Sequence, residues 1–152
     1  THTAPPTGYL NTKSLSGIAF LPGSDEHFMS GAGGLLVRNN AGFFPAQTTN
    51  TTANLNAVWA GTQAIYMVGD GGTIVRRNAG DGQDGMVQTS GTTANLRAVS
   101  GANDTTIFAV GDGGTALLGN GTSWTKLPTI TSQTLYGVYA VDSSTVIAKG
   151  KR

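Results

Sequence analysis

Short apolar runs alternate with glycine-rich turns along most of this chain. The clearest turn is the segment 68–73, Val-Gly-Asp-Gly-Gly-Thr, which recurs letter for letter at 110–115 and in a weaker form, Ser-Gly-Ala-Gly-Gly-Leu, at 30–35. Apolar residues flank each copy on both sides, a pattern typical of two β-strands joined by a turn. Asp-Gly between such strands favours a type I′ turn, in which both central residues have positive φ. We therefore predict a tandem series of β-hairpins.

A second repeated motif gives the period of the series. Residues 51–58, Thr-Thr-Ala-Asn-Leu-Asn-Ala-Val, return at 92–99 as Thr-Thr-Ala-Asn-Leu-Arg-Ala-Val, and looser copies surround Leu15 and Leu135. The four leucines that mark these copies, Leu15, Leu55, Leu96 and Leu135, are 40, 41 and 39 residues apart. A period of roughly 40–45 residues is that of a four-stranded propeller blade. The pattern predicts an all-β protein, a β-propeller.

Each complete blade is expected to contain four strands, here lettered A to D in chain order. We predict one domain of residues 1–152, with three complete blades at 13–50, 51–91 and 92–131 and a partial fourth at 132–152. Residues 1–8 offer an outer strand for that last blade, because proline is tolerated in an edge strand. The predicted strands are 15–20, 27–31, 34–38 and 43–48, then 55–60, 64–69, 73–78 and 85–89, then 96–101, 106–111, 115–119 and 123–127, and finally 135–141 and 145–149.

Composition supports this fold and narrows the function. Of 152 residues 23 are glycine and only 11% are charged, which suits a turn-rich β protein better than a helical bundle. A net charge of +1 without a long basic run argues against nucleic-acid binding. No apolar stretch approaches the roughly 18 residues of a membrane span, so we expect none. Without cysteine, and with His2 and His27 isolated, we expect neither a metal nor a cofactor.

Positions that differ between the copies are the candidates for function. The residue after the strand-A leucine changes in every copy, and in a propeller this position lies beside the turns between strands B and C. With the aspartates of those turns it predicts a polar rim at the mouth of the channel. The alternative is that rim positions vary because solvent tolerates many side chains there. The candidate ligand-binding residues are Ser16, Asn56, Arg97, Tyr136, Asp70, Asp112 and Trp59.

The repeat unit as a whole resembles a known class of propeller repeats. Leu-x-Ala/Gly-Val-x-Gly, then Ile-Phe/Tyr-x-Val-Gly-Asp-Gly-Gly-Thr and Gly-x-x-Trp are similar to repeats of photosystem II assembly factor-like and Asp-box proteins, most specifically over residues 51–124. The segment 119–124, Gly-Asn-Gly-Thr-Ser-Trp, resembles an Asp box with asparagine in place of aspartate. The resemblance implies a propeller but no particular activity. Because such repeats occur in many secreted or lipid-anchored bacterial proteins, it also implies a secreted or cell-surface bacterial protein.

Two functions carried by such repeats can be checked against the residues. A sialidase needs an arginine triad and a tyrosine nucleophile with a partner glutamate, whereas only Arg97 lies on an inner strand and the single glutamate, Glu26, falls in a turn between strands A and B. An assembly factor would imply a thylakoid partner and an arginine patch. Arg38, Arg76 and Arg77, from the C strands of adjacent blades, are expected to form at most a small one.

The sequence thus predicts a non-catalytic, extracytoplasmic binding or scaffolding module that recognises a glycan or a protein at the face of the B–C turns. Two alternatives stay open: an Asp-box-type glycoside hydrolase that uses Asp70 or Asp112, and a structural piece of a larger propeller with an assembly-factor role. The way the ring closes is open as well. One chain could close a four-bladed ring, or a homo-oligomer could complete it.

Overall fold

Strands joined by turns and loops form the protein, whose computed structural model describes residues 13–80, 82–129 and 131–150. Within these residues there is no α-helix, and nothing helical is long and apolar enough to cross a membrane. Four antiparallel sheets follow one another along the chain. The strands are β1 (Leu15–Phe20), β2 (His27–Gly31) and β3 (Leu36–Asn39) in blade 1; β4 (Leu55–Ala60), β5 (Ala64–Gly69), β6 (Ile74–Asn78) and β7 (Met86–Gln88) in blade 2; β8 (Leu96–Asn103), β9 (Thr106–Gly111), β10 (Ala116–Gly119) and β11 (Trp124–Lys126) in blade 3; and β12 (Leu135–Ala140) and β13 (Val146–Gly150) in blade 4.

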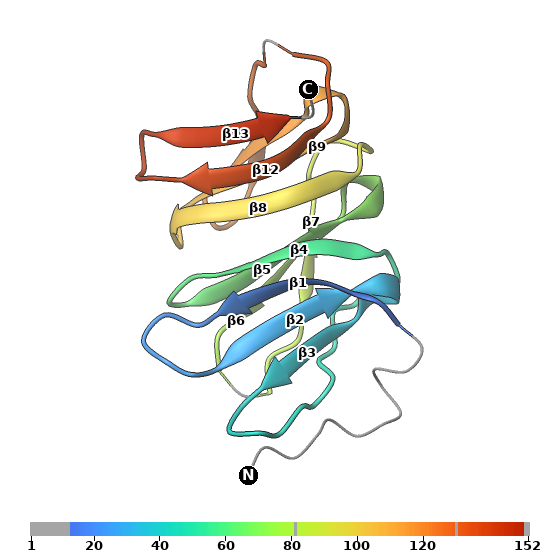
Figure 1. The fold of residues 1–152 in the computed structure, drawn as a ribbon, viewed down its shortest axis with the longest axis vertical. Coiled ribbons are helices and arrows are strands. Elements are labelled where there is room, and N and C mark those ends of the chain that lie inside the picture. Colours follow the sequence, from blue (N-terminus) through green and yellow to red (C-terminus); the bar gives the residue numbers. More distant parts are fainter. Residues whose placement is uncertain (1–12, 81, 130, 151–152) are drawn as a thin grey trace.

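The blades are stacked in chain order, from blade 1 in blue to blade 4 in red (Figure 1). Their first strands β1, β4, β8 and β12 lie side by side, so that each sheet packs face to face on the next. This is the arrangement of a β-propeller in which only part of the ring is present. It confirms the predicted all-β propeller with a period near 40 residues and an incomplete fourth blade.

Blade 1 differs from the prediction at its outer edge. Residues 43–48 do not form the expected fourth strand. Two isolated bridges pair Ala46 with Val37 and Phe43 with Asn40, and the Gln47 N–H donates to the Leu36 carbonyl at 2.8 Å. Pro45 explains the difference, because proline has no N–H to give to a sheet ladder. The outer strand that residues 1–8 were predicted to add to blade 4 lies outside the described residues.

The glycine-rich turns are also displaced by one residue from the prediction. In blade 2 the short turn η2 (Asp70–Gly72) is closed by the Thr73 N–H, which donates to the Asp70 carbonyl at 3.2 Å. Its positive-φ residues are Gly71 at 65° and Gly72 at 73°, and not the Asp-Gly pair. The turns η1 (Ala32–Gly34) and η3 (Asp112–Gly114) repeat this geometry. The motif therefore survives in blade 1 without an aspartate, because only the two glycines are needed for the turn.

The second turn glycine also touches the following blade. A Cβ atom on Gly72 would lie 1.9 Å from the Thr92 carbonyl oxygen, and one on Gly34 would lie equally close to the Thr51 carbonyl oxygen. Both threonines belong to the linker that leads into the next blade. Each turn is thus pressed against the start of the next repeat, where a side chain has no room.

The apolar core lies between the blades and not inside any one of them. Side chains of a strand alternate between its two faces. In β5, Ile65 and Met67 pack toward blade 1, whereas Tyr66 and Val68 pack toward blade 3. The core between blades 2 and 3 is made of Ala64, Tyr66, Val68, Ile74, Leu96, Val99, Ile107, Ala109 and Leu117.

Candidate functional site

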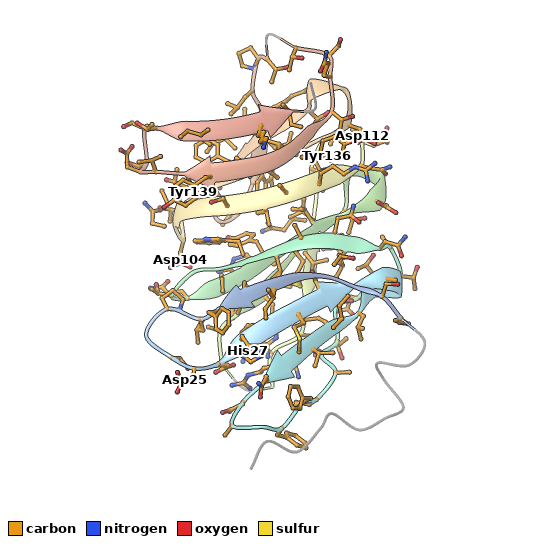
Figure 2. All side chains as sticks on the ribbon, in the orientation of Figure 1. Asp25, His27, Asp104, Asp112, Tyr136 and Tyr139 are labelled. Carbon is orange, nitrogen blue, oxygen red and sulfur yellow. The ribbon has the colours of Figure 1, made fainter. Side chains whose placement is uncertain are left out.

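Five of the predicted site residues lie at the end of the blades that carries the η turns. Asn56, Arg97 and Tyr136 are the second residues of β4, β8 and β12, while Asp70 and Asp112 begin η2 and η3. Because the first strands lie side by side, these residues form a line across blades 2, 3 and 4. Figure 2 shows Asp112 and Tyr136 together at this end. We call these five residues the turn-end row.

In blade 2 two amides hold the carboxylate of Asp70. Nδ2 of Asn56 donates to its Oδ1 at 2.9 Å, and Nδ2 of Asn54 donates to its Oδ2 at 3.1 Å. The Asn56 amide also donates to the Leu96 carbonyl at 2.8 Å, which joins blade 2 to blade 3. Amides satisfy a carboxylate as acceptor but bring no positive charge to it.

In blade 3 a guanidinium takes the place of the amides. Nε of Arg97 donates to Oδ1 of Asp112 at 2.8 Å, and Nη2 donates to Oδ2 at 3.1 Å, a bidentate pair. This hydrogen bonding lowers the pKa of Asp112 and raises the pKa of Arg97. Both side chains are about one third exposed, so the pair contributes at most about 1 kcal/mol to stability.

The row continues on both sides of Arg97. The bond to Asp112 raises the pKa of Arg97, partial burial lowers it, and the negative charges of Asp112 and Asp70 raise it further. The Asp112 pair uses two of the five guanidinium N–H donors, and the Tyr136 side chain is exposed. The row therefore offers an alternating series of donors and acceptors to a polar ligand.

The two remaining candidates are not part of this row of five residues, and only Trp59 lies elsewhere. Ser16 is the second residue of β1, at the same end as the row, and it is exposed on blade 1 at the rim of a hollow of about 410 Å³ that Leu15, Ile18 and Met29 also line. Trp59 packs between blades 2 and 3, with its ring centroid 6.1 Å from that of Tyr66. Its side chain belongs to the core and lies apart from the turn-end row.

The sequence analysis gave no role to two asparagines that connect the blades at this end. Oδ1 of Asn54 accepts the Gly33 N–H of the preceding turn at 3.0 Å, and Oδ1 of Asn95 accepts the Gly71 N–H at 2.9 Å. Each asparagine thus belongs to one blade and completes the turn of the blade before it. Their identical position in the two copies of Thr-Thr-Ala-Asn-Leu could have indicated this role from the sequence.

A third residue without a predicted inter-blade role lies at the opposite end of the blades. The carboxylate of Asp104, in blade 3, accepts the Thr62 hydroxyl at 2.6 Å and the N–H groups of Thr62, Gln63 and Ala64 of blade 2 at 3.1 to 3.2 Å. Partial burial raises the pKa of Asp104, but these hydrogen bonds outweigh it and leave the pKa below its ordinary value. Only blade 3 has an aspartate at this position, so the repeat pattern did not indicate its role.

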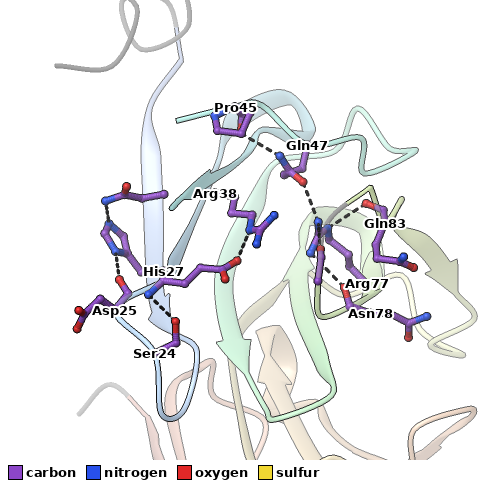
Figure 3. Close-up of polar contacts among 12 residues, drawn as sticks. Ser24, Asp25, His27, Arg38, Pro45, Gln47, Arg77, Asn78 and Gln83 are labelled. Atoms are coloured by element: carbon purple, nitrogen blue, oxygen red, sulfur yellow. Dashed lines mark hydrogen bonds and ion pairs between the residues drawn. The ribbon is translucent and has the colours of Figure 1, made fainter. Parts of the chain in front are cut away.

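Arg38, Arg76 and Arg77, expected to form at most a small patch, form none, because Arg38 and Arg77 are buried. Figure 3 shows the contacts of these two arginines. Arg77 is 0% exposed; it donates to the carbonyls of Gln83 and Gly80 and to Oε1 of Gln47, and it lies over the ring of Phe28. Arg38 is ion-paired with Glu26. These arginines fasten loops and neighbouring blades together, and they offer no basic surface.

Few places in the described chain are suited to a small ligand. No group of three or more histidine, aspartate or glutamate side chains gathers there to hold a metal. An open hollow of about 640 Å³ lies beside η2, lined by residues 71–73 and 87–93. Its walls are formed by the turn, by Val87 and Gln88 of β7 and by the small residues of the linker, and they bring no acid and base together.

Comparison with known proteins shows similarity in structure only. No protein-family model matches the chain, and no curated protein matches its sequence. YCF48 from Cyanidioschyzon merolae superposes with a TM-score of 0.73 at 15% sequence identity, over 90% of this chain and 48% of that one. A structure of YCF48 bound to D1 peptide gives 0.60 at 15% identity, over 84% of this chain and 43% of that one.

These similarities concern the fold. They support the propeller architecture and, at that level, the resemblance to assembly-factor repeats. This chain spans about half the length of the YCF48 chains that it matches.

Proposed function

We propose that this chain is a non-catalytic module that binds a partner protein, and that it does so by taking up a peptide segment along the turn-end row. The observation that carries the proposal is the row itself. Asn56, Arg97 and Tyr136 come from the equivalent position of successive blades, yet their chemistry differs at every step, while Asp70 and Asp112 place the same carboxylate beside this position in blades 2 and 3. A structural role alone would be met by the same side chain in each repeat.

A peptide suits this row better than a compact ligand. The residues follow one another across three blades, and an extended peptide presents alternating N–H and carbonyl groups along a line. Arg97 can donate to a carbonyl or carboxylate, and Tyr136 offers both an exposed ring and a hydroxyl. The structurally similar YCF48 has been seen bound to D1 peptide, which supports a protein as the kind of partner.

The state of the carboxylates supports binding over hydrolysis. A glycosidase acid must hold a proton near neutral pH, so its pKa is raised. Asp112 has the opposite environment, because Arg97 lowers its pKa. Asp70 has both oxygens occupied by the amides of Asn54 and Asn56. We extend the proposal to an extracytoplasmic location, supported by a sequence without cysteine and with 11% charged residues.

Peptide selection tests the proposal directly. A displayed library of random peptides is selected on the folded chain, and the best peptide is synthesised and titrated by fluorescence anisotropy. We expect the double variant Arg97→Ala/Tyr136→Ala to weaken binding by about tenfold or more, as for anchor residues of an interface. Lys126→Ala, which removes a positive charge from the exposed strand β11, is the control and should bind as the wild type does.

Two results would contradict the proposal. One is a peptide whose affinity is the same for the double variant and for the control. The other is a library that yields no binder while a glycan array, run with the same labelled chain, gives a ligand that depends on Arg97; the row would then serve a sugar.

A further inference from the structure

Blades 1 and 4 each have one face that no described blade covers. For each blade we call the side toward the preceding blade its front face and the side toward the following blade its rear face. Positions that are buried inside the array are exposed on these two end faces. Tyr139 on the rear face of blade 4 is 65% exposed, and Phe20 on the front face of blade 1 is 62% exposed.

Strand register shows which residues are equivalent on the rear faces. Ala19, Trp59, Ser100 and Tyr139 are each the fifth residue of a first strand, and each is paired with the corresponding residue of the second strand, as Trp59 is with Tyr66 and Tyr139 with Ile147. The next residue along each first strand belongs to the front face. These front residues are Phe20, Ala60, Gly101 and Ala140.

Across each junction the rear residue of one blade meets the front residue of the next. The Trp59 ring fills the space over Gly101, since a Cβ atom on that glycine would lie 2.5 Å from the ring. At the following junction Oγ of Ser100 accepts the Ala140 N–H at 3.1 Å. Ala19 packs against the buried cluster that contains Ala60.

The front residue is therefore glycine or alanine at all three junctions, while the rear residue ranges from alanine to tryptophan. The spacing of the sheets is the physical reason: a large ring from one blade needs a partner without a side chain. Tyr139, a large aromatic residue, stands at the position of Trp59. Phe20 stands at the position of Gly101 and breaks the pattern.

We propose that the rear face of blade 4, formed by Gly137, Tyr139, Ile147 and Lys149, is a docking surface for a further propeller blade with glycine or alanine at the front position. The partner is thus a β-sheet of the same repeat type, different from blade 1 of this chain. A second copy does not fit, because its Phe20 would meet Tyr139. The YCF48 chains, about twice as long as the part this chain matches, support continuation of the array.

One substitution in the existing chain creates a test partner. Phe20→Ala gives blade 1 a small front residue, so the rear face of blade 4 in one copy can receive blade 1 of another. We expect the dissociation constant for self-association to fall by about tenfold or more relative to the wild type. The measurement is sedimentation velocity over a concentration series, starting from the 15.5 kDa monomer.

Control variants distinguish steric complementarity between the two faces from non-specific hydrophobic association. Removing an exposed apolar side chain ordinarily weakens association, so Ile18→Ala, on the same front face, should associate no better than the wild type. Phe20→Ala/Tyr139→Ala should lose the gain, because a void replaces the aromatic ring. Circular dichroism checks that each variant is folded.

Three outcomes would overturn the proposal. They are a wild type that already associates as tightly as Phe20→Ala, a Phe20→Ala variant that gains nothing, and a gain that persists after Tyr139 is removed. A gain that requires Tyr139 supports it.

Discussion

The junction between blades 2 and 3 and the junction between blades 3 and 4 have the same turn geometry but different strength at the opposite end. At the first, Trp59, Tyr66 and Trp124 form an aromatic cluster with ring centroids 6.0 to 6.1 Å apart, and Asp104 binds three backbone N–H groups of the neighbouring blade. At the second, Ser100 makes one hydrogen bond to Ala140. The repeated motif therefore specifies the turns, while residues outside the motif set how firmly two blades are held.

The acidic residues of the two loops illustrate the difference. In blade 3, Asn103 caps its own loop by accepting the Thr105 N–H, which leaves Asp104 free to reach blade 2. In blade 4 it is Asp142 that caps its own loop, accepting the Ser144 N–H at 2.8 Å. The position after it is a serine, so the inter-blade clamp has no carboxylate there. The aspartate of blade 4 stands one position earlier in its repeat than Asp104, and it therefore binds its own loop and not the neighbouring blade.

The largest effect is expected from Gly72→Ala, at the turn end of the junction between blades 2 and 3. A methyl group there overlaps the Thr92 carbonyl and the residue has a φ of 73°, so we expect a loss of about 3–4 kcal/mol in urea unfolding. Gly71→Ala is the matched control, because φ is 65° but the space is open, and should cost about 1–2 kcal/mol. Equal losses would mean that the contact with the linker is unimportant.

Trp59→Ala and Tyr139→Ala compare equivalent positions in a filled junction and on a free face. Trp59 lies against Gly101 and Tyr66, and its removal leaves a cavity that should cost about 3 kcal/mol. Tyr139 is exposed, so its removal should cost less than about 0.5 kcal/mol. The check is the midpoint of urea unfolding for both variants, and a Tyr139→Ala loss as large as that of Trp59→Ala would show that the last blade is covered in solution.

Asp104→Asn should weaken the same junction in a pH-dependent manner. Hydrogen bonds from blade 2 stabilise the carboxylate, and bonds to a charged group suggest a loss of about 1–3 kcal/mol at neutral pH. Because the folded-state pKa lies below the ordinary value of about 4, this stability is present above that value and is lost as the pH falls through the folded-state pKa.

The measurement for Asp104 is the difference in unfolding free energy between wild type and variant from pH 7 down to pH 2. It should shrink at the acidic end of the series. Asp142→Asn is the control, because that carboxylate caps only its own loop, and should give a smaller difference at neutral pH. A difference for Asp104→Asn that does not change with pH would contradict a role for the ionised carboxylate.

Arg97→Ala is expected to have only a small effect on stability. Its pair with Asp112 is at the surface, so the loss should be below about 1 kcal/mol and should diminish as salt is added. Thermal unfolding at low and high salt measures it. A large loss that salt does not alter would mean that Arg97 supports the fold, and the row would then lose its interpretation as a binding surface.

The repeats made the fold more predictable than the candidate site. The bounds of β4, β5 and β9 match the predicted strands because continuous apolar runs end at glycine in each copy. The sequence placed Arg97 and Asp112 at one end of the blades, but it did not predict that they pair. Trp59 was a candidate for ligand binding, whereas its side chain packs in the core, because the alternation of faces along the strand directs it between the blades.

Features outside the repeat could not be read from the pattern. Pro45 prevented the strand expected at residues 43–48. This effect could not be predicted without knowing where the outer edge of blade 1 lies, because proline is tolerated at some edge positions and not at others. Arg77 and Arg38 looked like a surface patch because charge is ordinarily exposed, and their burial depends on loop carbonyls and on Glu26. Asp104 acts on residues about forty positions earlier, a contact that only the stacking of blades creates.

The asparagines that complete turns η1 and η2 from the next blade also imply an order for synthesis. Gly33 meets Asn54 across 21 residues, and Gly71 meets Asn95 across 24. The turn N–H of such a blade therefore lacks its asparagine acceptor until the following linker has left the ribosome. Blades 1 and 2 are thus each completed by the start of the following repeat, before that repeat is complete itself.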